Sequence, residues 1–236
     1  MADVPVEAGR HPAFAERIDE RERMVATQIQ ARGVRDPNVL QAMRAVPRHA
    51  FVPETQQALA YADHPLPIGH EQTVSQPYVV AFMTEALGLD PNSVVLEIGT
   101  GSGYQAAVCA EIAREVYSIE ILEPLARSAI ELLTKLGYSN VHIRAGDGFY
   151  GWPDAGPFDA IIGTAAAREI PGPLIEQLKP GGRMILPVEG ESGFQRLILL
   201  TKDEQGQLHR KAVMPVRFVP MTGRVSTTSE GLPAEP

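Results

Sequence analysis

The sequence predicts an α/β fold, a doubly wound and mostly parallel β-sheet with a helical extension at its N-terminus and antiparallel strands at its C-terminus. Three observations indicate this fold. From about residue 94, short apolar runs typical of buried strands alternate with amphipathic stretches typical of helices. A glycine-rich turn, 99-GTGSG-103, follows the first apolar run and opens a helical pattern. Two further strand patterns, 194–201 and about 209–219, have no helix between them, which predicts an antiparallel hairpin edge.

Composition limits the class of protein. The chain has 236 residues, 44% of them apolar, which is enough to bury a sizeable core. Its net charge of −8 disfavours nucleic acid as a partner, because that affinity depends largely on Lys and Arg. The sequence has no signal-like N-terminus and no apolar run long enough to cross a membrane, so we expect a cytoplasmic protein. We also expect a monomer. The single cysteine, Cys109, excludes an internal disulfide and is expected to be a buried apolar residue.

The N-terminal third is predicted to be helical and then irregular. Residues 1 to about 13 are rich in Pro, Gly and Ala and are expected to be loose, whereas 14–29 show an apolar stripe opposite charges, which predicts a helix. A second helix is predicted to begin at Asp36-Pro37 and to end at Pro47. From 47 to 76 only one short helical stretch, about 54–60, is expected, and long ordered loops of this kind are often functional.

The central part is predicted to alternate strictly between strands and helices. Pro77 opens a helix that Gly88 closes. The predicted strands cover 94–98, 115–119, 140–144, 158–163 and 183–188, and the further helices cover about 102–113, 123–136 and 171–178. Such alternation indicates βαβ units and a parallel sheet covered on both faces. Residues 223–236 are polar and rich in Gly and Pro, so they are expected to fray.

The glycine loop predicts a ligand site. Gly99, Gly101 and Gly103 lie between a strand and a helix, where doubly wound sheets bind nucleotide-like ligands. Tyr104 stands where a dinucleotide-binding loop, G-x-G-x-x-G, needs its third glycine. Glu97, just before the loop, would repel phosphates and attract a cation. The loop therefore favours S-adenosylmethionine, which carries an ammonium and a sulfonium in place of phosphates.

Two more acids follow the next strands. Glu120 ends the second strand, where a carboxylate accepts both ribose hydroxyls, although a nicotinamide cofactor would use this acid too. Asp147 lies in 146-GDG-148, where it could accept a hydrogen bond from the adenine amine while Gly148 permits a tight turn. A lone Asp in such a loop is more often a simple Asx turn. Only the combined arrangement predicts a methyl-donor site.

Five segments then resemble a known family. They are 94–104, 73-TVSQPYVVAFMTE-85, 158-FDAIIGTAAAREIP-171, 178-LKPGGRMILPV-188 and 216-VRFVPMTG-223. Together they are similar to the protein-L-isoaspartate (D-aspartate) O-methyltransferases, over about residues 20 to 223. The resemblance implies a Rossmann-like, class I S-adenosylmethionine-dependent methyltransferase that uses no metal. It implies methylation of the free α-carboxyl of L-isoaspartyl residues, with D-aspartyl residues as a second class, in damaged proteins and peptides. The products would be S-adenosyl-L-homocysteine and an ester that starts repair through a succinimide.

The resemblance also implies site residues. Ser75 matches the active-site serine, Val74 and Gln76 flank it on the substrate side, Val219 matches the backbone partner of the peptide, and Thr222 lies toward the cofactor. Without the resemblance, Ser75 would be interpreted as a cap of the helix that begins at Pro77. With the resemblance, the chain is expected to divide into 1–76 (N-terminal helices and substrate loop), 77–222 (methyltransferase core with C-terminal strands) and 223–236 (flexible tail). Many bacterial members have two prolines where this chain has 166-AAR-168, which affects the expected loop shape there.

The residues suit this chemistry. A substrate carboxylate with an ordinary pKa of about 3.5 is ionised at neutral pH and needs no general base. His64 and His70 would then be surface, packing or cleft-lining residues, and Tyr150 and Trp152 would stack on adenine or pack in the core. The alternatives are an NAD-dependent oxidoreductase, another class I methyltransferase, or a non-catalytic module that binds S-adenosylmethionine without turnover.

Overall fold

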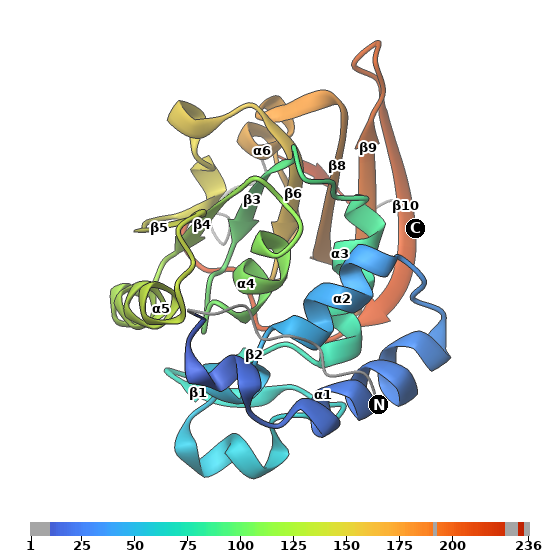
Figure 1. The fold of residues 1–236 in the computed structure, drawn as a ribbon. Coiled ribbons are helices and arrows are strands. Elements are labelled where there is room, and N and C mark those ends of the chain that lie inside the picture. The colour runs from blue at the N-terminus through green and yellow to red at the C-terminus, as the bar shows by residue number, and fades with distance from the viewer. Residues whose placement is uncertain (1–9, 191–192, 225–230, 234–236) are drawn as a thin grey trace.

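The chain folds around a seven-stranded sheet (Figure 1). The computed structural model describes residues 10–190, 193–224 and 231–233. The strand order is β10-β9-β8-β6-β3-β4-β5, in which β8 to β5 are parallel neighbours and β9 and β10 are antiparallel. The strands are β3 (Val94–Ile98), β4 (Glu115–Glu120), β5 (Val141–Ala145), β6 (Phe158–Gly163), β8 (Leu178–Glu189), β9 (Gln195–Lys202) and β10 (Leu208–Val216). The predicted α/β class with a C-terminal antiparallel hairpin is therefore confirmed.

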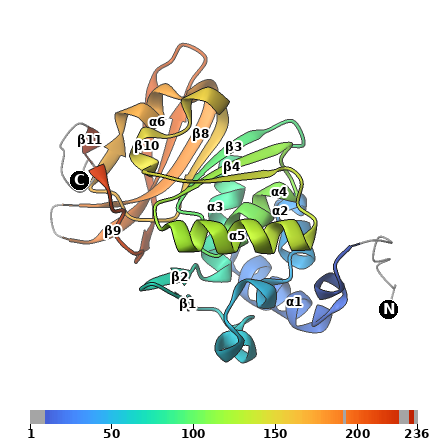
Figure 2. The same cartoon turned by 90° about the vertical axis from the view of Figure 1, so that its left-hand side faces the viewer.

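Helices lie on both faces of the sheet (Figure 2), and hydrophobic side chains pack between them and the strands. One face packs against α3 (Pro77–Leu87), α4 (Tyr104–Ala110) and α5 (Glu123–Leu136), and the other packs against α6 (Gly172–Glu176). Successive residues of β3 alternate between the two layers, with Val95 in the first and Leu96 in the second. Because both directions are buried, β3 is apolar on both faces rather than alternating, with Glu97 as its one polar residue.

Two helix boundaries agree with the sequence signals. Helix α3 has Pro77 in its first turn and ends at Gly88, whose φ of 63° suits a residue without a Cβ. Helix α2 (Pro37–Ala45) begins after Asp36, whose carboxylate accepts from the amides of Asn38 and Val39, and it ends before Pro47.

The predicted single helix over 14–29 is wrong. A 3₁₀ turn (Pro12–Ala15) is followed by a break at Arg17, whose φ is 52°, before α1 (Ile18–Met24) begins. Helix α1 continues into a π turn (Val25–Ile29) and a 3₁₀ turn (Gln30–Arg32). The break is stabilised by Arg21, whose buried guanidinium donates to the carbonyl of Phe14 at 2.6 Å. The predicted loose segment is ordered from residue 10, and residues 1–9 lie outside the described part.

The segment 47–76 contains more structure than expected. It holds 3₁₀ helices at Arg48–Phe51 and Glu54–Leu59, and an unpredicted antiparallel pair, β1 (Leu66–Gly69) and β2 (Gln72–Val74). Three consecutive residues at the turn of this hairpin, Gly69, His70 and Glu71, have positive φ. Two of them are not glycine, so the turn gave no familiar sequence signal.

The C-terminal elements differ in detail from prediction. Helix α6 ends at Glu176 because β8 already begins at Leu178. In the tail expected to fray, β11 (Gly231–Pro233) pairs with β7 (Glu169–Pro171), and the rest beyond residue 224 lies outside the described residues. The division of the chain at residues 76 and 222 stays a prediction.

Candidate active site

A cavity of about 260 Å³ lies at the carboxyl ends of β3, β4 and β6. This is the edge at which open α/β sheets bind their ligands. Of the predicted cofactor residues, the cavity is lined by Gly99, Gly101, Glu120, Gly148 and Thr222. Val219, predicted for the substrate side, also lines it. We call this space the cofactor cavity.

The glycines of the loop serve different purposes. Gly99 has a φ of 96°, and a Cβ there would lie 2.5 Å from Oγ1 of Thr164. Gly103 does not line the cavity. A Cβ at Gly103 would instead lie 3.0 Å from Leu133 of α5. The first two glycines therefore shape the cavity wall, and the third permits close helix packing.

Glu120 is held rigidly at the cavity wall. Its side chain accepts from the amide of Gly101 at 2.8 Å and from the amide of Leu122 at 3.0 Å. Each carboxylate oxygen has a second acceptor site, so the predicted bidentate acceptance from ribose hydroxyls is compatible with this geometry.

The predicted contact of Glu97 with the ligand is wrong. Glu97 is fully buried and is not among the cavity-lining residues, and its carboxyl accepts from the hydroxyl of Ser118. Burial, with a smaller contribution from Glu120, raises the pKa of Glu97 to about 8. Glu97 is therefore largely neutral at pH 7 and supports the loop from behind.

Asp147 forms the Asx turn that was the alternative interpretation. One oxygen accepts from the amide of Phe149 at 2.9 Å, and the other accepts from the amide of Arg224 at 2.8 Å. Gly148, not Asp147, lines the cavity. Trp152 lies edge-on to Tyr117, so it packs against the sheet.

A second space, the peptide cleft, has a volume of about 320 Å³ and is lined by Ser75, Gln76 and Val219 of the predicted substrate residues. Val74 does not line it, because this residue of β2 points into the hydrophobic core with 5% exposure. The cleft and the cofactor cavity share three lining residues, Thr73, Thr164 and Val219. We call these three residues the shared rim.

Ser75 does not cap α3. The N-cap residue is Gln76, and no side chain makes the cap hydrogen bond. Among the described residues, no hydrogen bond engages the Ser75 hydroxyl. This hydroxyl is half-buried at the cleft and is free to bind a ligand.

The two spaces carry opposite charges. Glu71 and Glu120 line the cofactor cavity, and no Arg or Lys of the described chain does. Arg32 and Arg217 line the peptide cleft, and no Asp or Glu among the described residues does. The arrangement suits a cation on one side of the rim and an anion on the other.

Several site residues escaped the sequence analysis. The sequence did not predict the hairpin turn or the lining residues Glu71, Thr73 and Thr164. His70 was considered for the cleft, but it lines the cofactor cavity. Thr164 directly follows β6, so the rule that located Glu120 and Gly148 at strand ends could have found it. The hydroxyl of Thr164 donates to the carbonyl of Ile98, which ties β6 to the glycine loop.

Cys109 is buried, as predicted, and burial raises the pKa of its thiol to about 12, so it is no nucleophile at neutral pH. Among the described residues, no cluster of three or more His, Cys, Asp or Glu could hold a metal. Within the same part of the chain, no helix is long and apolar enough to span a bilayer.

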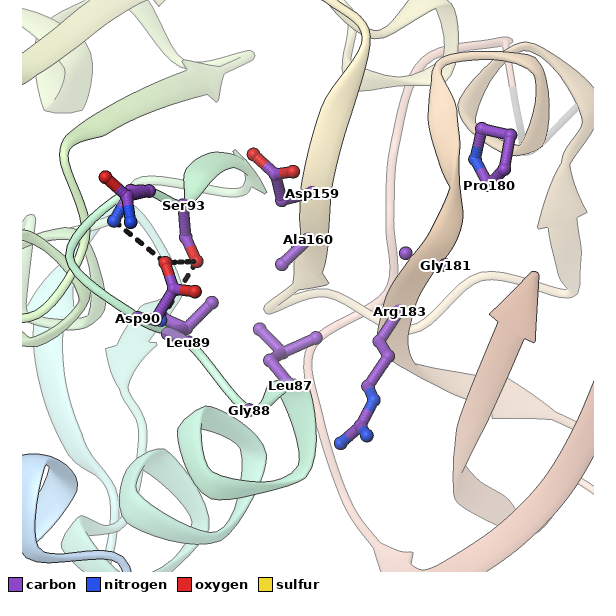
Figure 3. A pocket seen from close by; sticks show the side chains of 12 residues that line it. Leu87, Gly88, Leu89, Asp90, Ser93, Asp159, Ala160, Pro180, Gly181 and Arg183 are labelled. Carbon is purple, nitrogen blue, oxygen red and sulfur yellow. Dashed lines mark hydrogen bonds between the residues drawn. The ribbon is translucent and has the colours of Figure 1, made fainter. Parts of the chain in front are cut away.

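A third cavity, of about 320 Å³, lies at the opposite edge, where β3, β6 and β8 begin (Figure 3). Its two acids are engaged by their neighbours. Asp90 accepts from the hydroxyl of Ser93, and Asp159 accepts from the amide of Val94 and from Lys179. It lies away from the glycine loop and from Ser75.

Comparison with known proteins agrees with this geometry. The family model described as protein-L-isoaspartate(D-aspartate) O-methyltransferase matches residues 19–226. The protein-L-isoaspartate O-methyltransferase 2 of Syntrophobacter fumaroxidans is 53% identical over 222 residues, which cover 94% of this chain and 89% of that protein. The protein-L-isoaspartate O-methyltransferase of Opitutus terrae is 56% identical over 213 residues, covering 90% and 91% respectively.

Solved structures agree as well. A protein-L-isoaspartate O-methyltransferase superposes with a TM-score of 0.80 at 32% identity, over 87% of this chain and 67% of its own. A beta-aspartate methyltransferase from Plasmodium falciparum, in complex with S-adenosyl-L-homocysteine, has the same fold, with a TM-score of 0.73 at 24% identity and coverage of 87% and 97%. The extent and identity of these matches show that this chain belongs to the protein-L-isoaspartate(D-aspartate) O-methyltransferase family.

Proposed function

We propose that this chain transfers the methyl group of S-adenosylmethionine to the free α-carboxylate of L-isoaspartyl residues in damaged proteins and peptides, with D-aspartyl residues as a second class. The following backbone nitrogen then attacks the ester and methanol leaves, which gives a succinimide and starts repair. The observation that carries the proposal is the meeting of an acid-lined cavity and an arginine-lined cleft at the rim of Thr73, Thr164 and Val219. Family membership supports both the reaction and the acceptor.

The cofactor cavity fits the methyl donor. When bound there, S-adenosylmethionine supplies an electrophilic methyl group on a sulfonium. Glu120 accepts from the ribose hydroxyls, and the backbone of Gly99 and Gly101 permits close approach. The side chain of Thr222 and the backbone of Gly148 complete the wall. The lack of basic side chains among the described lining residues disfavours phosphate-bearing cofactors and so weighs against a nicotinamide-dependent enzyme.

The cleft positions the acceptor. The Ser75 hydroxyl donates to one oxygen of the substrate carboxylate and leaves the other directed at the rim. The first turn of α3, to which Tyr78 and Val79 belong, adds amides that favour negative charge. The carbonyl of Val219 accepts from the amide of Ala166 at 2.8 Å, so a bound peptide would pair with the amide of Val219 instead. Val74 supports this loop from the core.

Catalysis then rests on positioning. An ionised carboxylate needs no base, and correct placement of two reactants supplies up to about 7–11 kcal/mol. Neutralising an anion and a cation in one step also favours a site that excludes water.

The test uses labelled S-adenosylmethionine and two peptides that differ only in isoaspartate or aspartate at one position. Base-labile methyl ester on the isoaspartyl peptide alone is expected. Equal labelling of both peptides, or donor binding without labelling of either, would contradict the proposal. Monomeric state and cytoplasmic location stay predictions, and light scattering after size exclusion measures the first.

A further inference from the structure

Arg217 is an unpaired cation in the peptide cleft. Arg217 lines the cleft and is exposed. Within the described residues no hydrogen bond or ion pair engages its guanidinium. The other cation, Arg32, is already bound to Asp63 at 2.8 Å and lies 3.5 Å from the centre of the Tyr78 ring. Arg217 therefore contributes the uncompensated positive charge of a cleft with no acid among its described lining residues.

The backbone around Arg217 is fixed. The amide of Phe218 donates to the side chain of Gln195 at 2.6 Å, and the amide of that side chain donates back to the carbonyl of Phe218 at 3.1 Å. The carbonyl of Val219 accepts from Ala166. Because the two residues that follow it are held by these hydrogen bonds, the backbone of Arg217 has a defined position at the cleft.

Arg217 does not belong to the shared rim. It lines the peptide cleft only, whereas Thr73, Thr164 and Val219 line both spaces. We propose that Arg217 recognises an acidic side chain flanking the target residue, so that the enzyme prefers isoaspartyl peptides with Asp or Glu nearby. This inference rests on the proposed function and adds a sequence preference to it. In a chain with a net charge of −8, such a preference needs a local cation.

The experiment measures kcat/KM on isoaspartyl peptides that carry Glu, Gln or Lys at each position one and two residues before or after the target. Wild type is expected to prefer Glu over Gln at one of these positions by about fivefold, the upper end for an exposed ion pair. Arg217→Gln should abolish this preference, mainly by raising KM for the Glu-flanked peptide, and Arg217→Lys should retain part of it. At high salt the wild-type preference should shrink.

Lys211→Gln on β10 is the matched control, because it removes an exposed positive charge outside the cleft. It should keep the full preference. A wild type indifferent to flanking charge, while still methylating the Gln-flanked peptide, would overturn this inference and leave the proposed function standing. An equal loss of kcat on all peptides in Arg217→Gln would also overturn it, since Arg217 would then serve the reacting carboxylate. No methylation of any isoaspartyl peptide would overturn both.

Discussion

The cofactor cavity and the peptide cleft meet at one rim but are built differently. The cavity is shaped by backbone at strand ends, with glycines at positive φ and Glu120 fixed by two amides. The cleft is assembled from side chains of α3, the β2–α3 junction and the segment after β10. The donor side thus depends on chain geometry and the acceptor side on individual side chains. Substitutions in the cavity should therefore weaken donor binding, whereas substitutions in the cleft should impair methylation of the peptide.

The largest effect is expected from Gly99→Ala. A Cβ would meet Thr164 at 2.5 Å in a left-handed backbone, so the loop must move and donor binding should be lost. Gly137→Ala is the matched control, because its φ is 89° but a Cβ would meet nothing within 4 Å. Gly137→Ala should bind the donor normally and lose only about 1–3 kcal/mol of stability through backbone strain. Calorimetric titration measures donor binding and thermal unfolding measures stability. Unimpaired donor binding by Gly99→Ala would contradict the cavity assignment.

Next comes Ser75→Ala on the acceptor side. Losing one hydrogen bond to a carboxylate, worth about 1.5–3 kcal/mol, should lower kcat/KM for isoaspartyl peptide about 10- to 150-fold. Donor affinity should not change. Ser128→Ala on the exposed face of α5 removes a hydroxyl that donates to Pro124 and serves as the control. Weakened donor binding in Ser75→Ala would show that the two sides are not separable.

Glu120→Ala should produce the opposite pattern. The loss of a charge-assisted acceptor is expected to weaken donor binding by about 1–3 kcal/mol, with KM for the peptide little changed. Equilibrium binding of the donor measures this, and Glu120→Gln should retain part of the affinity because one acceptor oxygen remains. Unchanged affinity in both variants would remove the ribose assignment.

The smallest effect on binding and catalysis is expected for Glu97, beneath the cavity, which should instead change how stability depends on pH. Its pKa is raised from 4.5 to about 8, so the folded state holds a proton that the unfolded chain releases. Its contribution to stability is therefore present at low pH and is lost as pH rises from about 4.5 to about 8. Glu97→Gln removes this titration, so its stability relative to wild type should increase with pH across that window. Urea unfolding at several pH values measures the difference, and a constant difference would mean that Glu97 titrates normally.

The sequence predicted what depends on regular periodicity. The parallel strands, α3 and the C-terminal hairpin each bury a repeating stripe, so their residues carry the signal. Side-chain direction at a strand end does not follow from proximity in sequence, which is why Glu97 was misplaced although it lies two residues before Gly99. The β1–β2 hairpin was missed because His70 and Glu71 adopt positive φ without being glycine. The strand-end rule could have found Thr164, but the meeting of the three rim residues could not be predicted, because they lie in separate segments.

That separation has a kinetic consequence. The rim joins residues 73, 164 and 219, so it closes only after nearly the whole chain has found its place. Contacts between distant residues form slowly. The single tryptophan, Trp152, packs on Tyr117 of β4, and its fluorescence reports the more local half of the sheet. During refolding, methyl transfer should recover after tryptophan fluorescence, which makes enzymatic activity the stricter measure of a completely folded chain.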